Sequence, residues 1–364
     1  MTRKIFIFNN AWLSRTGISG SDLRAVQWSK QWRKMGFETI IFCSSNCRKN
    51  HERYGSKAKF VITSNLEDNF PSIMLNNTLL ALKNCLNVPK ARDKDIIYSS
   101  SDFLADSLPA FFMKMQNKKA KWVSGMHLIG KNATHYASQQ ITNQLLKKAD
   151  LVMVSNELDK QSIVKKGFKQ GKILVTYGAV DKPEKIRKSR QEFDACFIGR
   201  LHPQKGLQDL VRIWKNVCLK KPNAKLALIG EKVMLDALKQ EIENSGIQKN
   251  IEFLGTLNGE RKFSALKSSK VLLFPSHYES FGIVALEAMS VATPVIAYDL
   301  EIFEKIYPKG MVKAKRWNEK EFANQALKLI ENKSLRKKIS KEALENSKRF
   351  GWEKTAKEII ERLK

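Results

Sequence analysis

The sequence predicts an α/β protein built from two doubly wound parallel-sheet domains. Three observations predict it. Short β-rich apolar runs alternate with stretches of helical periodicity along the whole chain. The 364 residues are too many for one ordinary core and suit two domains of roughly 100–200 residues each. An apolar content of 43% excludes a mostly disordered chain.

The strand candidates form two series. The first comprises residues 5–8, 39–42, 60–62, 96–98, 122–124, 151–154 and 173–176. The second comprises residues 195–198, 225–229, 251–254, 271–274 and 295–297, with helical stretches at 207–219 and 232–244. A basic segment with neither strand nor helix signal, 181–190, predicts a linker between the two series. The C-terminal region, rich in Lys, Glu, Leu and Ile at helical spacing, predicts two or three closing helices.

A formal charge of +29 is the strongest compositional signal. It suits nucleic acid, an anionic membrane surface or anionic substrates, and equally a lysine-rich proteome with solvated surfaces. The excess is spread over both halves of the chain, which disfavours a discrete basic arm. Neither a helix-turn-helix nor an aromatic-plus-basic RNA signature is present, so we expect no specific nucleic-acid partner.

The cysteine pattern and the apolar runs indicate the compartment. Five scattered cysteines are too few for a disulfide framework, so we expect ordinary reduced thiols. No apolar run approaches the roughly 20 residues of a membrane-spanning helix. The opening apolar run is too short for a signal peptide and predicts a first strand. We therefore expect a cytoplasmic protein.

The segment 271–299 carries the strongest motif. A buried strand ends at Phe274, the loop SHYESFG follows, and a helix is expected to begin near Phe281. Glu279 then lies before the helix and Glu287, eight residues on, lies on its inner face. A buried carboxylate is costly unless paired, and a ribose diol offers two donors to Glu287. An amphipathic helix with Glu287 on a solvated flank is the alternative.

The start of the same helix predicts an anion site. The backbone N–H groups of Phe281, Gly282 and Ile283 lack partners within the helix. Gly282 has no Cβ, so a phosphate can approach it closely.

A second basic loop follows the strand that ends at Ile198. It contains Gly199, Arg200 and Lys205 and leads into a helix. Arginine offers a planar fork of donors and lysine a point charge, a combination suited to a diphosphate. The alternative is a common basic turn.

The first strand also leads into a glycine loop and a helix. The loop contains Gly17 and Gly20, and Ser19 or Ser21 is a candidate N-cap. GISGSD is not a GxGxxG fingerprint, and no acidic residue closes the second strand. These features count against a nicotinamide-dependent dehydrogenase.

Three further patterns have competing interpretations. His127 follows the strand 122–124 and either faces the ligand-binding edge of the sheet or is a structural histidine. The segment 108–122 is either a core helix with a basic end or a membrane-surface element. Asp93 and Asp95 formally match a metal-binding DxD pattern, but they precede a strand, which predicts a turn.

Six segments stand in the order typical of one enzyme family. They are ADLVMVSNELDKQSIVKKG (149–167), YGAVD (177–181), FIGRLHPQKGL (197–207), ALIGE (227–231), IEFLGTL (251–257) and PSHYESFGIVALEAMSVATPVIA (275–297). Over most of its length the chain resembles the retaining glycosyltransferases of family 4, also called group 1.

The resemblance implies the GT-B fold, with two Rossmann-like doubly wound parallel-sheet domains facing a cleft. Residues 1–183 would form the acceptor-side domain and residues 184–348 the nucleotide-sugar-binding domain. FGWEKTAKEI, within 349–364, looks like the closing helix that packs back on the first domain.

The resemblance also assigns roles to residues. In the family's E-x7-E motif, Glu279 would contact the donor sugar and Glu287 the ribose. Arg200 and Lys205 would hold the diphosphate, and His127 would lie near the transferred sugar. The implied donor-binding set is Gly17, Gly20, Gly199, Arg200, Lys205, Glu279, Ser280, Phe281, Gly282, Ile283 and Glu287. The catalytic set is His127, Glu279, Arg200 and Lys205, with no metal site. Family members often have paired glycines in the first loop, where this sequence has Gly17-Ile18-Ser19-Gly20. They also often have Asn before Gly in the GVD segment, where this sequence has Tyr177-Gly178.

The implied reaction moves a sugar from a nucleoside-diphosphate sugar to a glycan, lipid-linked or other hydroxyl acceptor, with retention at the anomeric carbon. It needs no metal or other cofactor and suits cell-surface polysaccharide or glycolipid synthesis. The enzyme would be cytoplasmic, with or without peripheral attachment to the inner face of the cell membrane. A nucleotide-sugar 2-epimerase on the same fold and a basic nucleic-acid-binding protein remain as alternatives.

Overall fold

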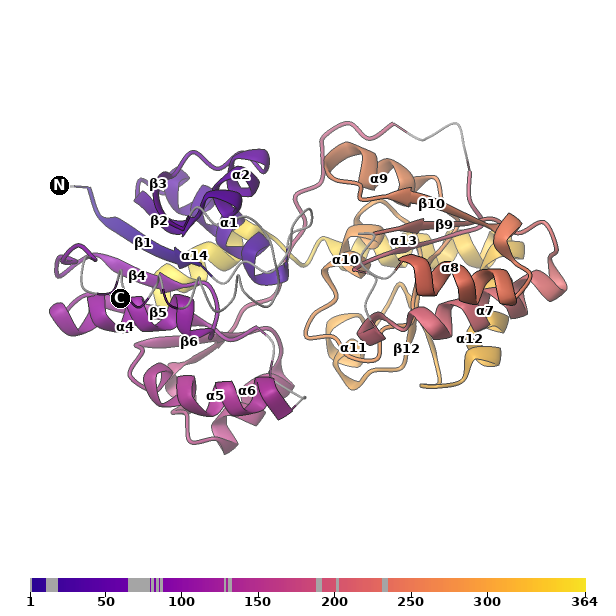
Figure 1. Ribbon diagram of the computed structural model, residues 1–364. Coiled ribbons are helices and arrows are strands. Elements are labelled where there is room, and N and C mark those ends of the chain that lie inside the picture. Colours follow the sequence, from indigo (N-terminus) through magenta and orange to yellow (C-terminus); the bar gives the residue numbers. More distant parts are fainter. Residues whose placement is uncertain are drawn as a thin grey trace. The chain divides into compact units, whose positions relative to one another are not determined.

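The computed structural model describes residues 2–10, 19–64, 79, 82, 85, 88–127, 129, 133–187, 192–200, 203–230 and 235–364. The chain forms two compact units (Figure 1). The first unit is Met1–Gly178 with Trp352–Lys364, and the second is Ala179–Gly351. The divisions fall close to the boundaries expected after residues 183 and 348.

The first unit is built on a parallel sheet in the order β3-β2-β1-β4-β5-β6-β7. Its strands are β1 (Lys4–Asn9), β2 (Glu38–Ser44), β3 (Lys59–Ser64), β4 (Ile96–Ser99), β5 (Lys121–Gly125), β6 (Leu151–Val154) and β7 (Ile173–Val175). Each strand predicted in the first half of the chain is confirmed. The direction of winding reverses between β1 and β4, where doubly wound sheets bind ligands at their carboxyl edge.

The helices described in this unit, apart from the C-terminal helix, pack on both faces of the sheet. They are α1 (Gly20–Lys34), α2 (Ser45–Arg53), α4 (Leu104–Gln116), α5 (Ala133–Leu146) and α6 (Glu157–Lys165), with the 3-10 turn η1 (Gln170–Lys172). Ser19 is the N-cap of α1, and its hydroxyl accepts a hydrogen bond from the Asp22 amide, as the sequence predicts.

Helix α4 is a core helix on one face, as one of the two interpretations of 108–122 predicts. Ala110 and Met113 are buried in the same core cluster as Phe6 and Phe8 of β1, so one face of the helix is core. Phe112 is nevertheless 38% exposed and Met115 48% exposed on the other side.

The C-terminal helix α14 (Trp352–Arg362) belongs to the first unit. It packs on α1, where the indole N–H of Trp28 donates to the Thr355 hydroxyl at 2.9 Å and that of Trp32 to the Ala356 carbonyl at 3.2 Å. The expected return of the chain to the first domain is therefore confirmed.

The second unit is built on a parallel sheet in the order β10-β9-β8-β11-β12-β13. Its strands are β8 (Ala195–Ile198), β9 (Leu226–Ile229), β10 (Ile251–Gly255), β11 (Leu272–Phe274), β12 (Val295–Tyr298) and β13 (Met311–Ala314). The first five match the predicted strands. The edge strand β13 was not predicted, because its short MVKA sequence has only one β-branched residue and no aromatic one.

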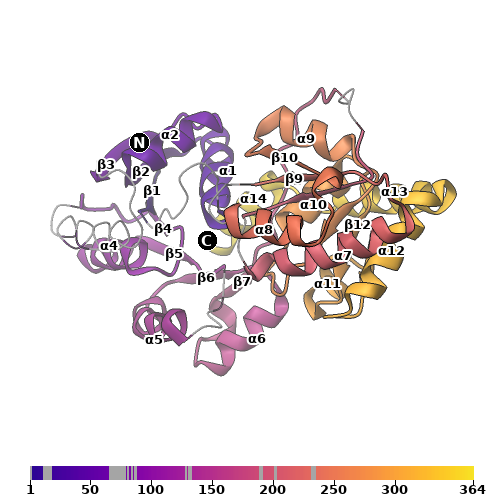
Figure 2. The same ribbon diagram turned by 45° about the vertical axis from the view of Figure 1, so that its right-hand side comes forward.

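Helices cover this sheet on both faces. They are α7 (Leu207–Lys220), α8 (Leu235–Asn244), α9 (Gly259–Lys267), α10 (Ile283–Ser290), α11 (Glu301–Ile306), α12 (Glu319–Glu331) and α13 (Lys333–Ser347), with the 3-10 turns η2 (Pro203–Lys205) and η4 (Gln248–Asn250). Figure 2 shows α7 and α12 side by side, and Trp214 of α7 and Phe322 of α12 share one core cluster.

Two general expectations from the sequence can be compared with the described residues. All five cysteines are buried free thiols, as predicted. Within the described ranges, no helix combines the length and the apolar character needed to cross a bilayer.

Candidate functional site

The best-organised polar site lies where the winding of the second sheet reverses. Strands β8 and β11 are neighbours there, but the chain leaves them in opposite directions along the sheet. The loop 199–206 leads from β8 to α7, and the loop 275–282 leads from β11 to α10. Such a reversal is where open α/β sheets bind ligands, outside the carboxyl ends of the strands.

Close backbone contacts join these two loops. The His277 amide donates to the Gln204 carbonyl at 2.9 Å, and the Gln204 side chain donates to the Tyr278 carbonyl at 3.1 Å. Gly206 has a φ of +68°, and a Cβ built on it would lie 2.0 Å from the Pro275 carbonyl oxygen. Only glycine fits this left-handed position against the neighbouring backbone. These contacts therefore join the two motifs, which lie about 70 residues apart in the sequence.

Each loop ends in a left-handed glycine that begins a helix. Gly206 precedes α7 and Gly282, with a φ of +81°, precedes α10; neither helix has a side-chain cap. The first-turn N–H groups of an α-helix have no partner within it, and they carry the positive end of the helix dipole. Helix α10 begins at Ile283, so the predicted anion site shifts slightly along the chain, while Phe281 is buried.

Two of the predicted catalytic residues meet between the loops. Lys205 Nζ lies 2.6 Å from Glu279 Oε1, and the two side chains are 17% and 10% exposed. Lys205 comes from the β8 loop and Glu279 from the β11 loop, so the ion pair joins the two motifs. Arg200 lies exposed on the β8 loop, after the half-buried Gly199. Ser280 is half-buried next to Glu279.

The second glutamate of the motif has a partner that the sequence did not suggest. Glu287 is buried on α10, which confirms the inner face and contradicts the solvated flank. Its Oε1 lies 2.5 Å from Nζ of Lys262, a residue of α9. Sequence reasoning missed Lys262 because it lies on a separate helix, 25 residues before Glu287.

A further polar cluster, centred on Asp209, contacts the β11 loop through His277. The carboxylate of Asp209 on α7 accepts hydrogen bonds from His277 at 2.9 Å, Tyr298 at 2.8 Å and Arg212 at 2.7 Å. The His277 ring also contacts Trp317, with ring centroids 4.2 Å apart. These contacts fix the residue two positions before Glu279. The acidic first turn of α7 was the one sequence signal that could have suggested Asp209.

His127 lies in the first unit, after the end of β5. It is 7% exposed, its ring centroid is 6.0 Å from that of Trp28, and its Nδ1 is 3.4 Å from the Ser155 hydroxyl. Its buried Nε2 has no hydrogen-bond partner among the described residues. Burial lowers the pKa of His127 well below its usual value, so the imidazole is neutral. The structure thus places His127 inside the unit, at the strand end from which a ligand-facing role was expected.

Of the first-unit glycine loop, Gly20 is the first residue of α1, and Gly17 lies outside the described residues. A buried polar network lies at the β1–β4 reversal. The Asn9 side chain donates to Asp22 at 2.8 Å and to the Ser100 hydroxyl at 2.9 Å, and Ser100 donates to Asp106 at 3.0 Å. Burial raises the pKa of Asp106 to about 7.

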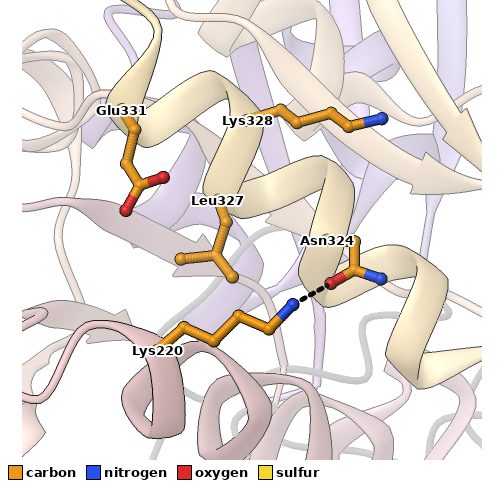
Figure 3. Close-up of a pocket in the computed structure, with 5 residues that line it drawn as sticks. All are labelled: Lys220, Asn324, Leu327, Lys328 and Glu331. Atoms are coloured by element: carbon orange, nitrogen blue, oxygen red, sulfur yellow. Dashed lines mark hydrogen bonds between the residues drawn. The ribbon is translucent and has the colours of Figure 1, made fainter.

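Two other features lie apart from this chemistry. Asp93 and Lys94 form a turn, as predicted, and the Asp95 carboxylate accepts a hydrogen bond from the Lys4 amide. A surface pocket of about 360 Å³ lies between α7 and α12 (Figure 3). Lys220, Asn324, Leu327, Lys328 and Glu331 line it. No predicted site residue borders this pocket.

Known proteins resemble this chain in sequence and in fold. Residues 180–346 match the family described as Glycosyl transferases group 1. An uncharacterized glycosyltransferase of Methanocaldococcus jannaschii is 31% identical over an alignment of 258 positions that covers 58% of this chain and 63% of that protein. A phosphatidyl-myo-inositol mannosyltransferase of Mycobacterium leprae is 29% identical over 168 residues, or 45% of this chain and 44% of that protein. The chain thus spans less than two thirds of these relatives.

The similarity to solved structures extends over the whole chain. Anabaena Alr3699/HepE, in complex with UDP and glucose, aligns over 99% of both chains with a TM-score of 0.80 and 18% identity. At this identity the likeness concerns the fold alone. The chain therefore has the GT-B fold, and its second unit matches the family of group 1 glycosyl transferases.

Proposed function

We propose that the protein is a glycosyltransferase that transfers a sugar from a nucleoside-diphosphate sugar to a hydroxyl acceptor. The observation that carries the proposal is the Lys205–Glu279 ion pair, held between two glycine-started helices at the reversal of the second sheet. The match of 180–346 to the group 1 family supports it. So does the fold shared with a protein solved with UDP-glucose.

In this proposal each polar group has one task. The diphosphate lies against the first turn of α10, and Lys205 and Arg200 supply positive charge. Glu279 accepts hydrogen bonds from the hydroxyls of the donor sugar, and Glu287 from those of the ribose. Gly199, Ser280 and Gly282 contact the donor only as the family resemblance implies. A Cβ on Gly282 would lie 3.2 Å from the Phe274 ring, so its lack of a side chain serves packing and does not open space for a phosphate, contrary to the expectation from the sequence. His127 and the glycine loop of the first unit remain family-based predictions.

The reaction that we propose retains the anomeric configuration. The bond between the anomeric carbon and the phosphate oxygen breaks, and its electron pair stays on the diphosphate. The acceptor oxygen bonds to the same face of that carbon, and its proton passes to the leaving phosphate. Lys205, Arg200 and the α10 dipole stabilise the charge that develops on the diphosphate. In this proposal the stabilisation requires no metal ion.

A donor panel tests this proposal. We expect one class of UDP-, GDP- or ADP-sugar to raise the melting temperature and to be hydrolysed slowly without acceptor, because it binds the folded state. Proton NMR of the first-formed product should show retention, and EDTA should leave the rate unchanged. Acceptor-free isomerisation of the donor would instead indicate an epimerase. No stabilisation by any nucleotide sugar would contradict the proposed donor site.

We further propose that the acceptor is a glycan or a lipid-linked saccharide of cell-surface polysaccharide or glycolipid synthesis. The protein would act in the cytoplasm, on the inner face of the membrane. The exposed Phe112 and Met115 of α4, followed by exposed Lys118 and Lys119, support contact with an anionic surface.

Vesicle binding tests the membrane part of the proposal. Lys118→Glu combined with Lys119→Glu should weaken binding to anionic vesicles by roughly tenfold or more, because each lysine near the surface contributes about 1 kcal/mol. The matched control is Lys337→Glu with Lys338→Glu, two exposed residues of α13 in the second unit. Equal binding of the wild type to neutral and anionic vesicles, or to neither, would refute the electrostatic attachment.

A further inference from the structure

The ion pair between Lys262 and Glu287 joins two neighbouring helices of the second unit. Lys262 lies on α9 and Glu287 on α10, with 2.5 Å between Nζ and Oε1. Their side chains are only 15% and 7% exposed. A buried carboxylate without a partner is strongly unfavourable, so Lys262 compensates the charge that α10 carries inward.

The pair leaves part of the carboxylate available. Among the described residues, no other donor lies within hydrogen-bonding distance of the Glu287 carboxylate oxygens. An ionised carboxylate has two oxygens and accepts about four hydrogen bonds. Lys262 therefore holds one oxygen in place while the other can still accept a hydrogen bond from a ligand.

The packing of α9 on α10 has supports other than this pair. The Thr293 hydroxyl, just after α10, donates to the Leu266 carbonyl of α9 at 2.9 Å. Phe263 and Leu266 are 2% and 0% exposed on the inner side of α9. Because these contacts do not involve Lys262, we expect the two helices to stay joined when its charge is removed. The Lys262 stem is itself unbranched and close in shape to methionine.

We propose that Lys262 is a positioning residue that orients Glu287 to accept a hydrogen bond from the ribose of the donor. The inference rests on the proposed function, which places the ribose against Glu287. Fixing one oxygen reduces the rotamers open to the carboxylate, so the second oxygen is already oriented when the donor binds. Lys262 thereby governs the preference of the site for ribonucleotides over 2′-deoxyribonucleotides.

Paired ribo- and deoxyribonucleotides test this role. The dissociation constants of UDP and 2′-deoxy-UDP are measured by calorimetry for the wild type, Lys262→Met and Lys262→Arg. We expect the wild type to prefer UDP by roughly tenfold or more, since a hydrogen bond to a charged group is lost with the 2′-hydroxyl. Lys262→Met should bring the ratio close to one, and Lys262→Arg should restore most of it.

A matched control tests whether the effect requires the lysine that contacts Glu287 or only the loss of one positive charge from α9. Lys267→Met removes a lysine from the same helix, whose ammonium donates to the Ile186 carbonyl and not to Glu287. This variant should keep the wild-type ratio. If Lys262→Met does not fold, as judged by thermal unfolding, Lys262→Gln takes its place.

The possible failures are distinct. A wild type that binds UDP and 2′-deoxy-UDP equally contradicts the ribose role of Glu287 in the proposed function. A wild type that discriminates, together with a Lys262→Met variant that discriminates equally, overturns the inference alone. Tighter binding of both nucleotides by Lys262→Met also overturns it, because Lys262 would then obstruct the site. If UDP does not bind, GDP and ADP with their 2′-deoxy forms replace it. Binding of none of the three removes the donor site and the inference with it.

Discussion

Lys205→Ala should lower the transfer rate about a hundred- to a thousandfold, or ~3–4 kcal/mol of transition-state stabilisation, while the fold is retained. The reason is twofold. The variant loses the ammonium that would face the developing charge on the diphosphate. It also leaves Glu279, 9% exposed, without the partner 2.6 Å away. We expect kcat to fall more than the affinity for donor, because this interaction strengthens as the bond breaks.

The double variant Lys205→Ala with Glu279→Gln distinguishes these two contributions. If part of the loss comes from the unpaired carboxylate, the double variant should be less impaired than the sum of the single effects predicts. Lys215→Ala, which removes an exposed lysine further along α7, is the control and should leave kcat unchanged. Near-normal turnover of Lys205→Ala would show that the diphosphate lies elsewhere.

Gly206→Ala should destabilise the second unit by about 3 kcal/mol or more. The substitution forces an L-residue into a φ of +68° and places its Cβ 2.0 Å from the Pro275 carbonyl oxygen. One of the two loops must move, so Lys205 and Glu279 should separate and donor binding should weaken as well. Urea unfolding gives the change in the free energy of unfolding, and calorimetry gives the donor affinity.

Gly246→Ala is a closely matched control. Gly246 has a φ of +71°, but a Cβ built there meets no atom within 4 Å. It should therefore show the left-handed backbone penalty alone, about 1–2 kcal/mol, with unchanged donor affinity. Equal destabilisation by the two substitutions would mean that the contact between Gly206 and Pro275 does not hold the loops together.

The fold was largely predictable because both sheets are parallel and their interior strands are buried. Apolar runs such as Leu151–Val154 and Ala195–Ile198 form strands with these same bounds. The edge strand β13 has no such run, since Val312 is its only β-branched residue and Lys313 follows it. The other edge strands, β3, β7 and β10, were predicted because each has at least two β-branched or aromatic residues, as in Phe60–Ile62 of β3.

The proximity of Lys205 and Glu279 was predictable because both residues follow strand ends. Arg200, Lys205 and Glu279 follow β8 and β11, and parallel strands bring their carboxyl ends to one edge. Lys262 was not predictable in this way, because it acts from the side of a neighbouring helix. The burial of His127 was equally unpredictable from the sequence, since it depends on packing against Trp28, about 100 residues away.

A crystal structure with a bound nucleoside diphosphate is the most direct test of the donor site at the β8–β11 reversal. Our account predicts that both phosphates lie against the first-turn amides of α10, with Lys205 Nζ in contact with a phosphate oxygen and Glu287 in contact with the ribose. A diphosphate bound away from these residues, for example in the pocket between α7 and α12, would contradict it.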